Sequence, residues 1–292
     1  MTQFVLCAAV SGLLTGCAGL SGGESSWSRF EREHVFVAAK YPEGNWKPAA
    51  YTFEDVWFHT ADGTRLNGWY APCENPAAVV LLAHGNAGNV TNVAPLLKRL
   101  RDQHHVSVLA FDYRGYGKSE GRPDEPGILE DARAARSWLA KRANVDERDI
   151  VLMGQSLGGG VAVNLAAHDG ARGLVLISTF TSLPDVAGHH WPIVPAGWFM
   201  HNRLESISKI DKYDGPLLQV HGDKDRIIPI GQGEKLFARA HEPKRFVVSH
   251  GADHNDPLPV EFDGALDEFL ASLRPAKVLP QPKRWHAAGA GG

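Results

Sequence analysis

The chain has 292 residues, of which 43% are hydrophobic and 22% are charged, and its formal net charge at pH 7 is -3. This composition is typical of a folded globular protein, and it excludes both a disordered chain and a strongly basic nucleic-acid-binding protein. We therefore expect no nucleic-acid partner. Length alone allows either one large α/β domain or two small ones.

The N-terminus carries an apolar segment that is too short to cross a bilayer as a helix. It ends in the residues LTGC at 14–17, which resemble the lipobox of bacterial lipoproteins. The resemblance implies that residues 1–16 are a signal peptide, that Cys17 becomes lipidated, and that a lipid anchor holds the protein on a membrane of the bacterial cell envelope. Residues 17–49 would then form a tether and an N-terminal extension. No Lys or Arg precedes the apolar run, so an ordinary N-terminal segment with a chance cysteine is the alternative.

Two segments of alternating hydrophobicity, 51–60 and 65–72, flank the turn ADGT and predict an antiparallel hairpin. After the hairpin the pattern changes to short, continuous apolar runs, which are typical of strands covered on both faces. These runs occupy residues 77–84, 106–112, 149–155, 173–179, 216–222 and 244–250. They predict a mostly parallel sheet.

Helical patterns lie between these strands. Apolar residues recur at helical spacing in 93–100, 128–139 and 262–273. Strands that alternate with helices predict one doubly wound α/β domain over residues 50–273, with helices on both faces of the sheet. The Pro-, Ala- and Gly-rich residues 274–292 are predicted to be a disordered tail.

The alternation is interrupted at residues 181–210, which contain three prolines, two tryptophans, a phenylalanine and a methionine. An insertion after a strand is a suitable place for a lid over a pocket, and its apolar side chains could line a site for an acyl group. The same side chains could equally pack the insertion onto the body of the domain. Both interpretations stay open at this point.

Ser156 stands in the sequence GQSLG at 154–158, between a strand pattern and a helical pattern. This is G-x-S-x-G in the strand-turn-helix context of a serine nucleophile. Glycines suit such a turn because residues without a Cβ allow tight backbone angles and close contact between helix and strand. The free N–H groups at the start of the helix can stabilise an anion. The pattern is short, however, and an ordinary turn would also explain it.

A nucleophilic serine needs an acid and a base, which follow later strands in that order in hydrolases with this turn. Asp223 and Asp225 both follow the fifth apolar run, and His254 follows the sixth. Asp185 also follows a predicted strand, but its neighbours match no known pattern. The chain order of nucleophile, acid and base is therefore available.

Four passages and a closing HND together resemble the α/β-hydrolase superfamily, and within it the group that includes the α/β-hydrolase-domain depalmitoylases and many bacterial serine hydrolases. The passages are HGNAGN (84–89), FDYRGYGKSEG (111–121), GQSLGG (154–159) and HGDKDRIIP (221–229), followed by HND (254–256). The resemblance covers about residues 50–273. It implies the α/β-hydrolase fold, with a mostly parallel, doubly wound sheet, an N-terminal antiparallel hairpin and a short lid-like insertion.

The resemblance also implies roles for individual residues. The family pattern HG-x-x-D-x-x-[VI]-P selects the second of the two aspartates, Asp225, as the acid. Ser156 would be the nucleophile and His254 the general base, while Asp225 would hold the imidazole in its working orientation. The backbone N–H groups of Leu157 and Asn86 would form the oxyanion hole.

The residue patterns do not support a nucleotide or metal site. Residues 117–119, GKS, look like the end of a phosphate-binding loop, but Asp112 stands where that loop requires its first glycine. Histidine pairs at 104–105 and 189–190 occur without the spacing of a known metal site. We expect no metal and no organic cofactor, and we expect His84 to support the loop that follows it rather than to act as a base.

These observations predict a lipid-anchored serine hydrolase that cleaves carboxylic esters or thioesters through an acyl-enzyme intermediate. The expected partner is a small-molecule acyl ester or thioester, with a small or medium acyl group because the insertion is only about thirty residues long. A peptidase or amidase of the same fold is the nearer alternative. The other alternative is a noncatalytic, envelope-bound interaction module, because a fold does not determine a function.

Overall fold

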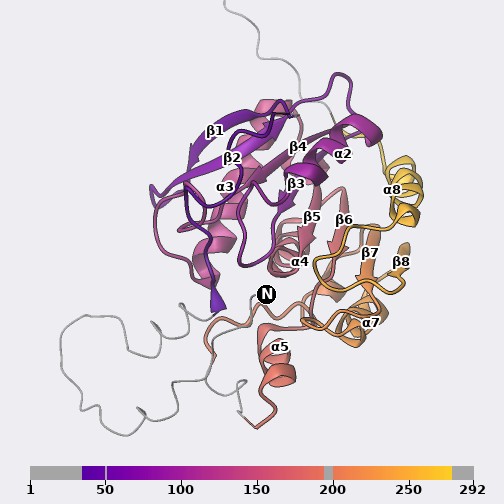
Figure 1. The fold of residues 1–292 in the computed structure, drawn as a ribbon. Helices are drawn as coiled ribbons and strands as arrows, with labels where there is room; N and C mark the ends of the chain where they lie inside the picture. The colour runs from indigo at the N-terminus through magenta and orange to yellow at the C-terminus, as the bar shows by residue number, and fades with distance from the viewer. Residues whose placement is uncertain (1–34, 50, 194–199, 278–292) are drawn as a thin grey trace, which may run out of the picture.

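The computed structural model describes residues 35–49, 51–193 and 200–277. Its strands are β1 (Glu54–His59), β2 (Arg65–Ala71), β3 (Ala78–Ala83), β4 (Val106–Phe111), β5 (Val151–Gln155), β6 (Gly173–Ile177), β7 (Leu217–Gly222) and β8 (Lys244–Ser249). They form one sheet in the order β1-β2-β4-β3-β5-β6-β7-β8 (Figure 1). Each strand lies within a segment that the sequence pattern predicted to be a strand.

The sheet is parallel except around β2, which runs antiparallel to both of its neighbours, β1 and β4. In the hairpin, Trp57 pairs with Asn67 and Val56 pairs with Gly68. The predicted leading hairpin and the predicted mostly parallel sheet are therefore both confirmed. The parallel strands read as continuous apolar runs because both of their faces are covered.

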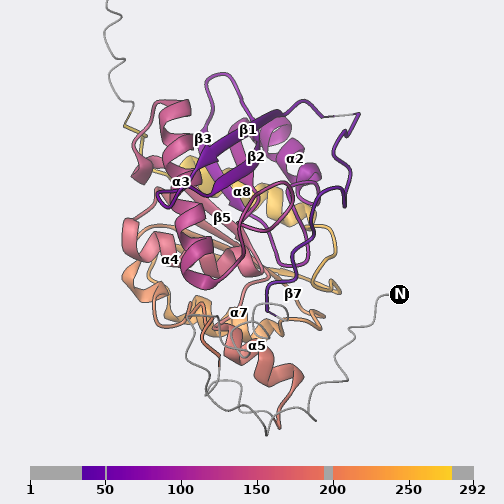
Figure 2. The same ribbon diagram turned by 90° about the vertical axis from the view of Figure 1, so that its left-hand side faces the viewer.

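Helices cover both faces. They are α2 (Ala94–His104), α3 (Glu125–Ala143), α4 (Leu157–Asp169), α5 (Leu183–His190), α7 (Ile230–Arg239) and α8 (Val260–Ser272), with the short 3-10 helices η1 (Glu147–Asp149) and η2 (Ile210–Lys212). Buried residues of α3, α4 and α7 pack on one face of the sheet, and those of α2 and α8 pack on the other. Figure 2 shows the sheet between these two layers. The predicted doubly wound architecture is confirmed.

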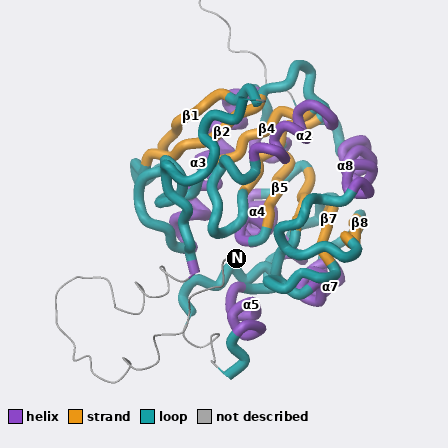
Figure 3. Tube along the Cα trace, viewed as in Figure 1, coloured by secondary structure: helices purple, strands orange, loops and turns teal. Residues whose placement is uncertain are grey.

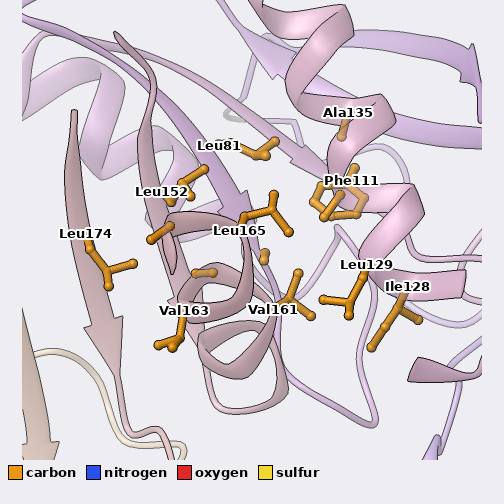
Figure 4. Packing of buried hydrophobic residues seen from close by; sticks show 14 of the residues in the cluster. Leu81, Phe111, Ile128, Leu129, Ala135, Leu152, Val161, Val163, Leu165 and Leu174 are labelled. Atoms are coloured by element: carbon orange, nitrogen blue, oxygen red, sulfur yellow. The ribbon is translucent and has the colours of Figure 1, made fainter. Parts of the chain in front are cut away.

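Successive residues of one strand belong to different cores. On β3, Leu81 packs in the core under α3 and α4, whereas Leu82 packs in the core under α2 and α8. Figure 4 shows the first of these cores, in which Leu152 of β5 lies close to Leu165 of α4. Burying one such side chain stabilises the fold by about 2 kcal/mol.

Several loops meet at the carboxyl ends of the parallel strands. Residues that follow β3, β5, β7 and β8 all line one cavity there. Helix α5 belongs to the predicted insertion at 181–210, and Figure 3 shows it beyond this end of the sheet, apart from the helices that cover the faces. Residues 194–199 of the insertion lie outside the described part of the chain.

Both ends of the described chain contact the body of the domain. At the C-terminal end, Arg274 forms an ion pair with Asp149, and the N–H of Lys277 donates to the Asp149 carboxylate over 2.7 Å. At the N-terminal end, Lys40 and Gly117 form an isolated parallel β-bridge. The predicted signal peptide and Cys17 lie outside the described residues. In the described parts of the chain, no helix has the length and apolar character that a membrane crossing requires.

Candidate active site

Ser156 occupies a strained turn between β5 and α4. Its backbone angles are φ 52° and ψ -115°, a conformation that a residue with a side chain rarely adopts. Hydrogen bonds with the end of β6 and with a residue that follows it hold Ser156 in this conformation. The N–H of Ser156 donates to the carbonyl oxygen of Ile177 over 2.9 Å, and the Thr179 hydroxyl donates to the carbonyl oxygen of Ser156 over 3.0 Å. The strained conformation of the turn is thus stabilised by hydrogen bonds to the rest of the fold.

The glycines around Ser156 are needed because β3, β5 and α4 approach one another closely. A Cβ on Gly154 would lie 2.2 Å from the carbonyl oxygen of Gly158, and a Cβ on Gly158 would lie 2.0 Å from that of Ala83. No side chain fits at either position. This crowding accounts physically for the two glycines of the pattern G-x-S-x-G.

Asp225 lies in the loop after β7 and is almost fully buried. Its Oδ1 accepts hydrogen bonds from the N–H groups of Ile227 and Ile228 over 2.9 Å and 2.8 Å. Its Oδ2 lies 2.7 Å from Nδ1 of His254 and 3.3 Å from Nε2 of His221. Both carboxylate oxygens therefore have partners, and one of them faces the predicted base.

The environment of Asp225 keeps its carboxylate charged. Burial acts to raise the pKa of this carboxyl, but hydrogen bonds from His221, from His254 and from the backbone of Ile228 hold its pKa well below the usual value of 3.8. Asp223, the other candidate, instead accepts a hydrogen bond from the N–H of Gly251 over 2.7 Å. The structure therefore pairs Asp225 with His254 and does not pair Asp223 with it.

His254 lies in the loop after β8 and is 7% exposed. Its neighbour Asp253 holds this loop, because Asp253 Oδ1 accepts the N–H of His254 over 2.8 Å and the N–H of Arg226 over 2.9 Å. The hydrogen bond from the N–H of Arg226 makes the largest contribution to lowering the pKa of Asp253 to about 2. Asp253 thus joins the loop of the acid to the loop of the base. Its contacts, and that of His221 with Asp225, were not anticipated from the sequence.

Ser156 and His254 line the same cavity, which has a volume of about 600 Å³. Leu157, the first residue of α4, and Asn86, in the loop after β3, line it as well. The Asn86 side chain is already used by the scaffold, since its Oδ1 accepts the Tyr116 hydroxyl over 2.7 Å. Four of the five residues that were predicted to act in catalysis thus line one cavity, and the fifth, Asp225, contacts His254.

The cavity has a largely apolar wall. One face of α5 contributes Leu183, Val186 and Ala187, which recur at helical spacing, and Trp191 follows them. The further apolar lining residues are Val35, Val37, Ala87, Val93, Leu157, Phe180, Met200, Ile227 and Ile228. Among the described residues, no Lys, Arg, Asp or Glu lines this cavity. The insertion thus contributes lining to the cavity in addition to packing on the body.

Other residues singled out in the sequence lie in supporting positions. His84 is 1% exposed, its Nδ1 lies 2.8 Å from the carbonyl oxygen of Gly85, and its Nε2 lies 3.4 Å from Asp112. Asp185 contacts the Thr181 hydroxyl within the insertion. In the described ranges, no group of three or more His, Cys, Asp or Glu side chains could hold a metal ion.

Comparison with known proteins points to one family. The family model for the alpha/beta hydrolase fold matches residues 78–200. An uncharacterised protein of Mycobacterium tuberculosis, Rv2307c, is 39% identical over 257 residues, which are 87% of this chain and 91% of the relative. The alpha/beta hydrolase domain-containing protein WAV2 of Arabidopsis thaliana is 32% identical over 209 residues, which are 64% of this chain and 67% of WAV2.

Solved structures share the architecture at lower identity. The esterase Pf2001 of Pyrococcus furiosus is similar with a TM-score of 0.64 and 21% identity, over 79% of this chain and 96% of the esterase. At this identity the likeness concerns the fold. Since WAV2 is an alpha/beta hydrolase domain-containing protein that is 32% identical and is matched over 67% of its length, the protein belongs to the α/β-hydrolase family.

Proposed function

We propose that the protein is a serine hydrolase that cleaves carboxylic esters or thioesters through an acyl-enzyme intermediate. The observation that carries the proposal is the 2.7 Å contact between Asp225 Oδ2 and Nδ1 of His254, a residue that lines the same cavity as Ser156. A charged carboxylate on one nitrogen of the ring leaves the other nitrogen to take a proton. The strained turn of Ser156 presents the hydroxyl to the same space.

In the proposed first half-reaction, Ser156 Oγ attacks the carbonyl carbon and its proton passes to His254 Nε2. The carbonyl oxygen takes up the negative charge and accepts hydrogen bonds from the N–H groups of Leu157 and Asn86. The intermediate then collapses, and the bond to the alcohol or thiol breaks as that group takes the proton from His254. Asp225 stabilises the imidazolium while it exists. Each oxyanion donor is worth about 3 kcal/mol of transition-state stabilisation.

In the second half-reaction, water replaces the departed alcohol or thiol. His254 takes a proton from the water, whose oxygen attacks the acyl carbon of the serine ester. When this second tetrahedral intermediate collapses, the carboxylic acid leaves and Ser156 regains its proton from His254. The enzyme returns to its starting state, and one water is consumed for each bond cleaved.

The lining of the cavity supports an uncharged acyl group as the substrate. Apolar side chains from α5 and from the loops provide favourable contacts with a hydrocarbon chain, whereas no lysine or arginine among the described lining residues would neutralise a charged group. We propose small or medium acyl groups, carried as oxygen esters or as the thioesters on which the resembled depalmitoylases act. Burying each methylene of such a chain contributes about 0.8 kcal/mol.

The experiment is turnover of p-nitrophenyl esters and of matched thioesters of graded chain length by the full chain and by Ser156→Ala. We expect turnover by the wild type that is lost in Ser156→Ala, together with labelling of Ser156 by a fluorophosphonate probe. Turnover restricted to peptide or amide substrates would favour a peptidase. Absence of both turnover and labelling would favour a noncatalytic module and would remove the proposal.

We also propose that Cys17 carries a lipid anchor that holds the protein on a membrane of the bacterial cell envelope. The residues LTGC at 14–17 support this. Replacement Cys17→Ala should release the protein from the membrane fraction, whereas Cys73→Ala, which changes a partly buried cysteine of the domain, should leave it there. Equal retention of both variants would contradict the anchor.

A further inference from the structure

We infer that the N-terminal strap, residues 35–43, is part of the active site: it holds the oxyanion loop, residues 84–92, in place and forms one wall of the substrate cavity. This inference deepens the proposed hydrolase function and rests on it. The strap precedes the first strand of the sheet. Its contacts with the oxyanion loop and its place in the cavity lining carry the inference.

The side chain of Asn86, in the oxyanion loop, forms hydrogen bonds with the strap. Its Nδ2 donates to the carbonyl oxygen of Val35 over 2.6 Å, and its Oδ1 accepts the N–H of Val37 over 3.0 Å. The same Oδ1 accepts the Tyr116 hydroxyl over 2.7 Å. Three hydrogen bonds thus join residues that are far apart in the sequence. They use the amide of the residue whose backbone N–H is proposed to bind the oxyanion.

Further backbone contacts tie the strap to both neighbouring loops. In the oxyanion loop, Asn89 Nδ2 donates to the carbonyl oxygen of Glu43 over 2.9 Å. In the loop after β4, the N–H of Gly117 donates to the carbonyl oxygen of Ala39 over 2.8 Å, and the carbonyl oxygen of Gly117 accepts the N–H of Tyr41 over 2.8 Å. The strap therefore bridges two separate loops and limits how far either can move.

The strap also contributes directly to the cavity. Phe36 is 4% exposed and packs into the core next to the sheet, so it anchors the segment. The residues on either side, Val35 and Val37, line the cavity. Val37 is 43% exposed, which leaves its side chain free to contact a substrate. The alternation of buried and cavity-lining residues places the two valines where they can select among acyl or leaving groups.

These hydrogen bonds matter because an oxyanion hole requires its donors to be positioned precisely. A donor must lie about 2.7–3.1 Å from the developing negative charge, so a loop that drifts by a fraction of this distance loses the interaction. We assign Asn86 as a positioning residue through its side chain, which acts by holding its own backbone N–H. We assign Val35 and Val37 as specificity-determining residues.

The first test is Asn86→Ala, which keeps the backbone N–H and removes the hydrogen bonds of the side chain. We expect kcat for a preferred ester to fall about 10²-fold, the cost of one misplaced oxyanion donor, with KM nearly unchanged. Hydrogen exchange at residues 84–92 should become faster while the rest of the sheet stays protected. Tyr116→Phe, which removes one of the three hydrogen bonds, should give a smaller fall. Wild-type kcat in Asn86→Ala, or equally faster exchange over the whole domain, would overturn the positioning role.

The second test concerns the wall. Val37→Trp should lower kcat/KM for the longer esters by about tenfold relative to the acetyl ester, and the double variant Val35→Ala, Val37→Ala should shift the preference toward bulkier substrates. Val260→Ala, at an exposed position in α8 outside the cavity, is the control and should keep the wild-type profile. An unchanged chain-length profile in the strap variants would contradict the proposal that the strap forms a wall of the substrate cavity. A wild type that neither turns over esters nor reacts with the probe would instead defeat the proposed function.

Discussion

At the scale of single residues, two aspartates two positions apart have very different surroundings. Asp225 is buried and hydrogen-bonded on both oxygens, and it contacts His254 and His221. Asp223 is turned toward His250 and the N–H of Gly251. Only Asp225 contacts His254, so in the proposed mechanism it is the aspartate that would stabilise the imidazolium. The pair therefore provides an internal comparison for the acid of the proposed triad.

The matched variants Asp225→Asn and Asp223→Asn test this assignment. Asp225→Asn should lower kcat for esters about 10⁴-fold, because an amide beside Nδ1 favours the wrong tautomer and cannot stabilise the cation. Asp223→Asn should stay close to the wild type. Steady-state kinetics with p-nitrophenyl esters measures both. Similar losses in the two variants would show that the acid has been assigned wrongly.

At the scale of elements, the connection from β5 to α4 is set by contact between backbones. Gly158 touches the end of β3, whereas Gly264 in the middle of α8 has open space around its missing side chain. The first glycine is required by packing. The second only weakens its helix, because glycine is less favourable than alanine in a helix interior by about 1 kcal/mol.

Replacing each of these glycines by alanine should therefore have opposite effects. Gly158→Ala should lower the free energy of unfolding by about 1–3 kcal/mol, since strands and helix must move apart, and it should reduce esterase activity. Gly264→Ala should raise the free energy of unfolding by about 0.4–1 kcal/mol with activity unchanged. Chemical denaturation measures both. A stable, active Gly158→Ala variant would contradict the crowding at the serine turn.

Helix α5 offers a second comparison of elements, between its cavity face and its outer face. Val186 lines the cavity, and His189 is exposed and does not. Val186→Trp should lower kcat/KM for longer acyl esters about tenfold relative to acetyl esters, because the ring occupies space that a chain would fill. His189→Trp should leave the profile unchanged. If both variants behave alike, α5 is not a wall of the substrate site.

At the scale of the whole molecule, hydrogen-bonded carboxylates make the fold sensitive to acid. Burial tends to raise the pKa of Asp225 and Asp263, but their hydrogen bonds outweigh it and lower both values; the N–H of Arg226 helps to lower the pKa of Asp253 to about 2. A carboxyl whose pKa is lower in the folded state adds stability above its unfolded pKa. That stability is lost as the pH falls through the folded pKa.

The melting temperature should therefore fall steeply as the pH is lowered from about 4 toward 2. The fall should be shallower in Asp225→Asn, which lacks one of these carboxyls. Differential scanning fluorimetry from pH 7 downward would measure it. A melting temperature that rises below pH 4 would contradict the direction of these pKa shifts.

The sequence by itself determined the strands, their order along the chain and most of the helices between them. The continuous apolar runs predicted the parallel strands, and alternation around the turn ADGT predicted the hairpin, because burial on two faces or on one imposes these patterns. Helix α7 was not anticipated, since its glycines weaken the helical signal. One of them, Gly233, is required because a Cβ there would lie 2.5 Å from His221 Nδ1.

Only the tertiary structure determined the contacts between distant segments. Local sequence could not show that Asp225 rather than Asp223 faces His254, and only the family pattern made that choice in advance. Nor could it show that residues 35–43 contact the loop of Asn86. These contacts are hydrogen bonds between a side chain and backbone atoms about fifty positions away. Backbone groups are the same in every residue, so such contacts leave no pattern in the sequence.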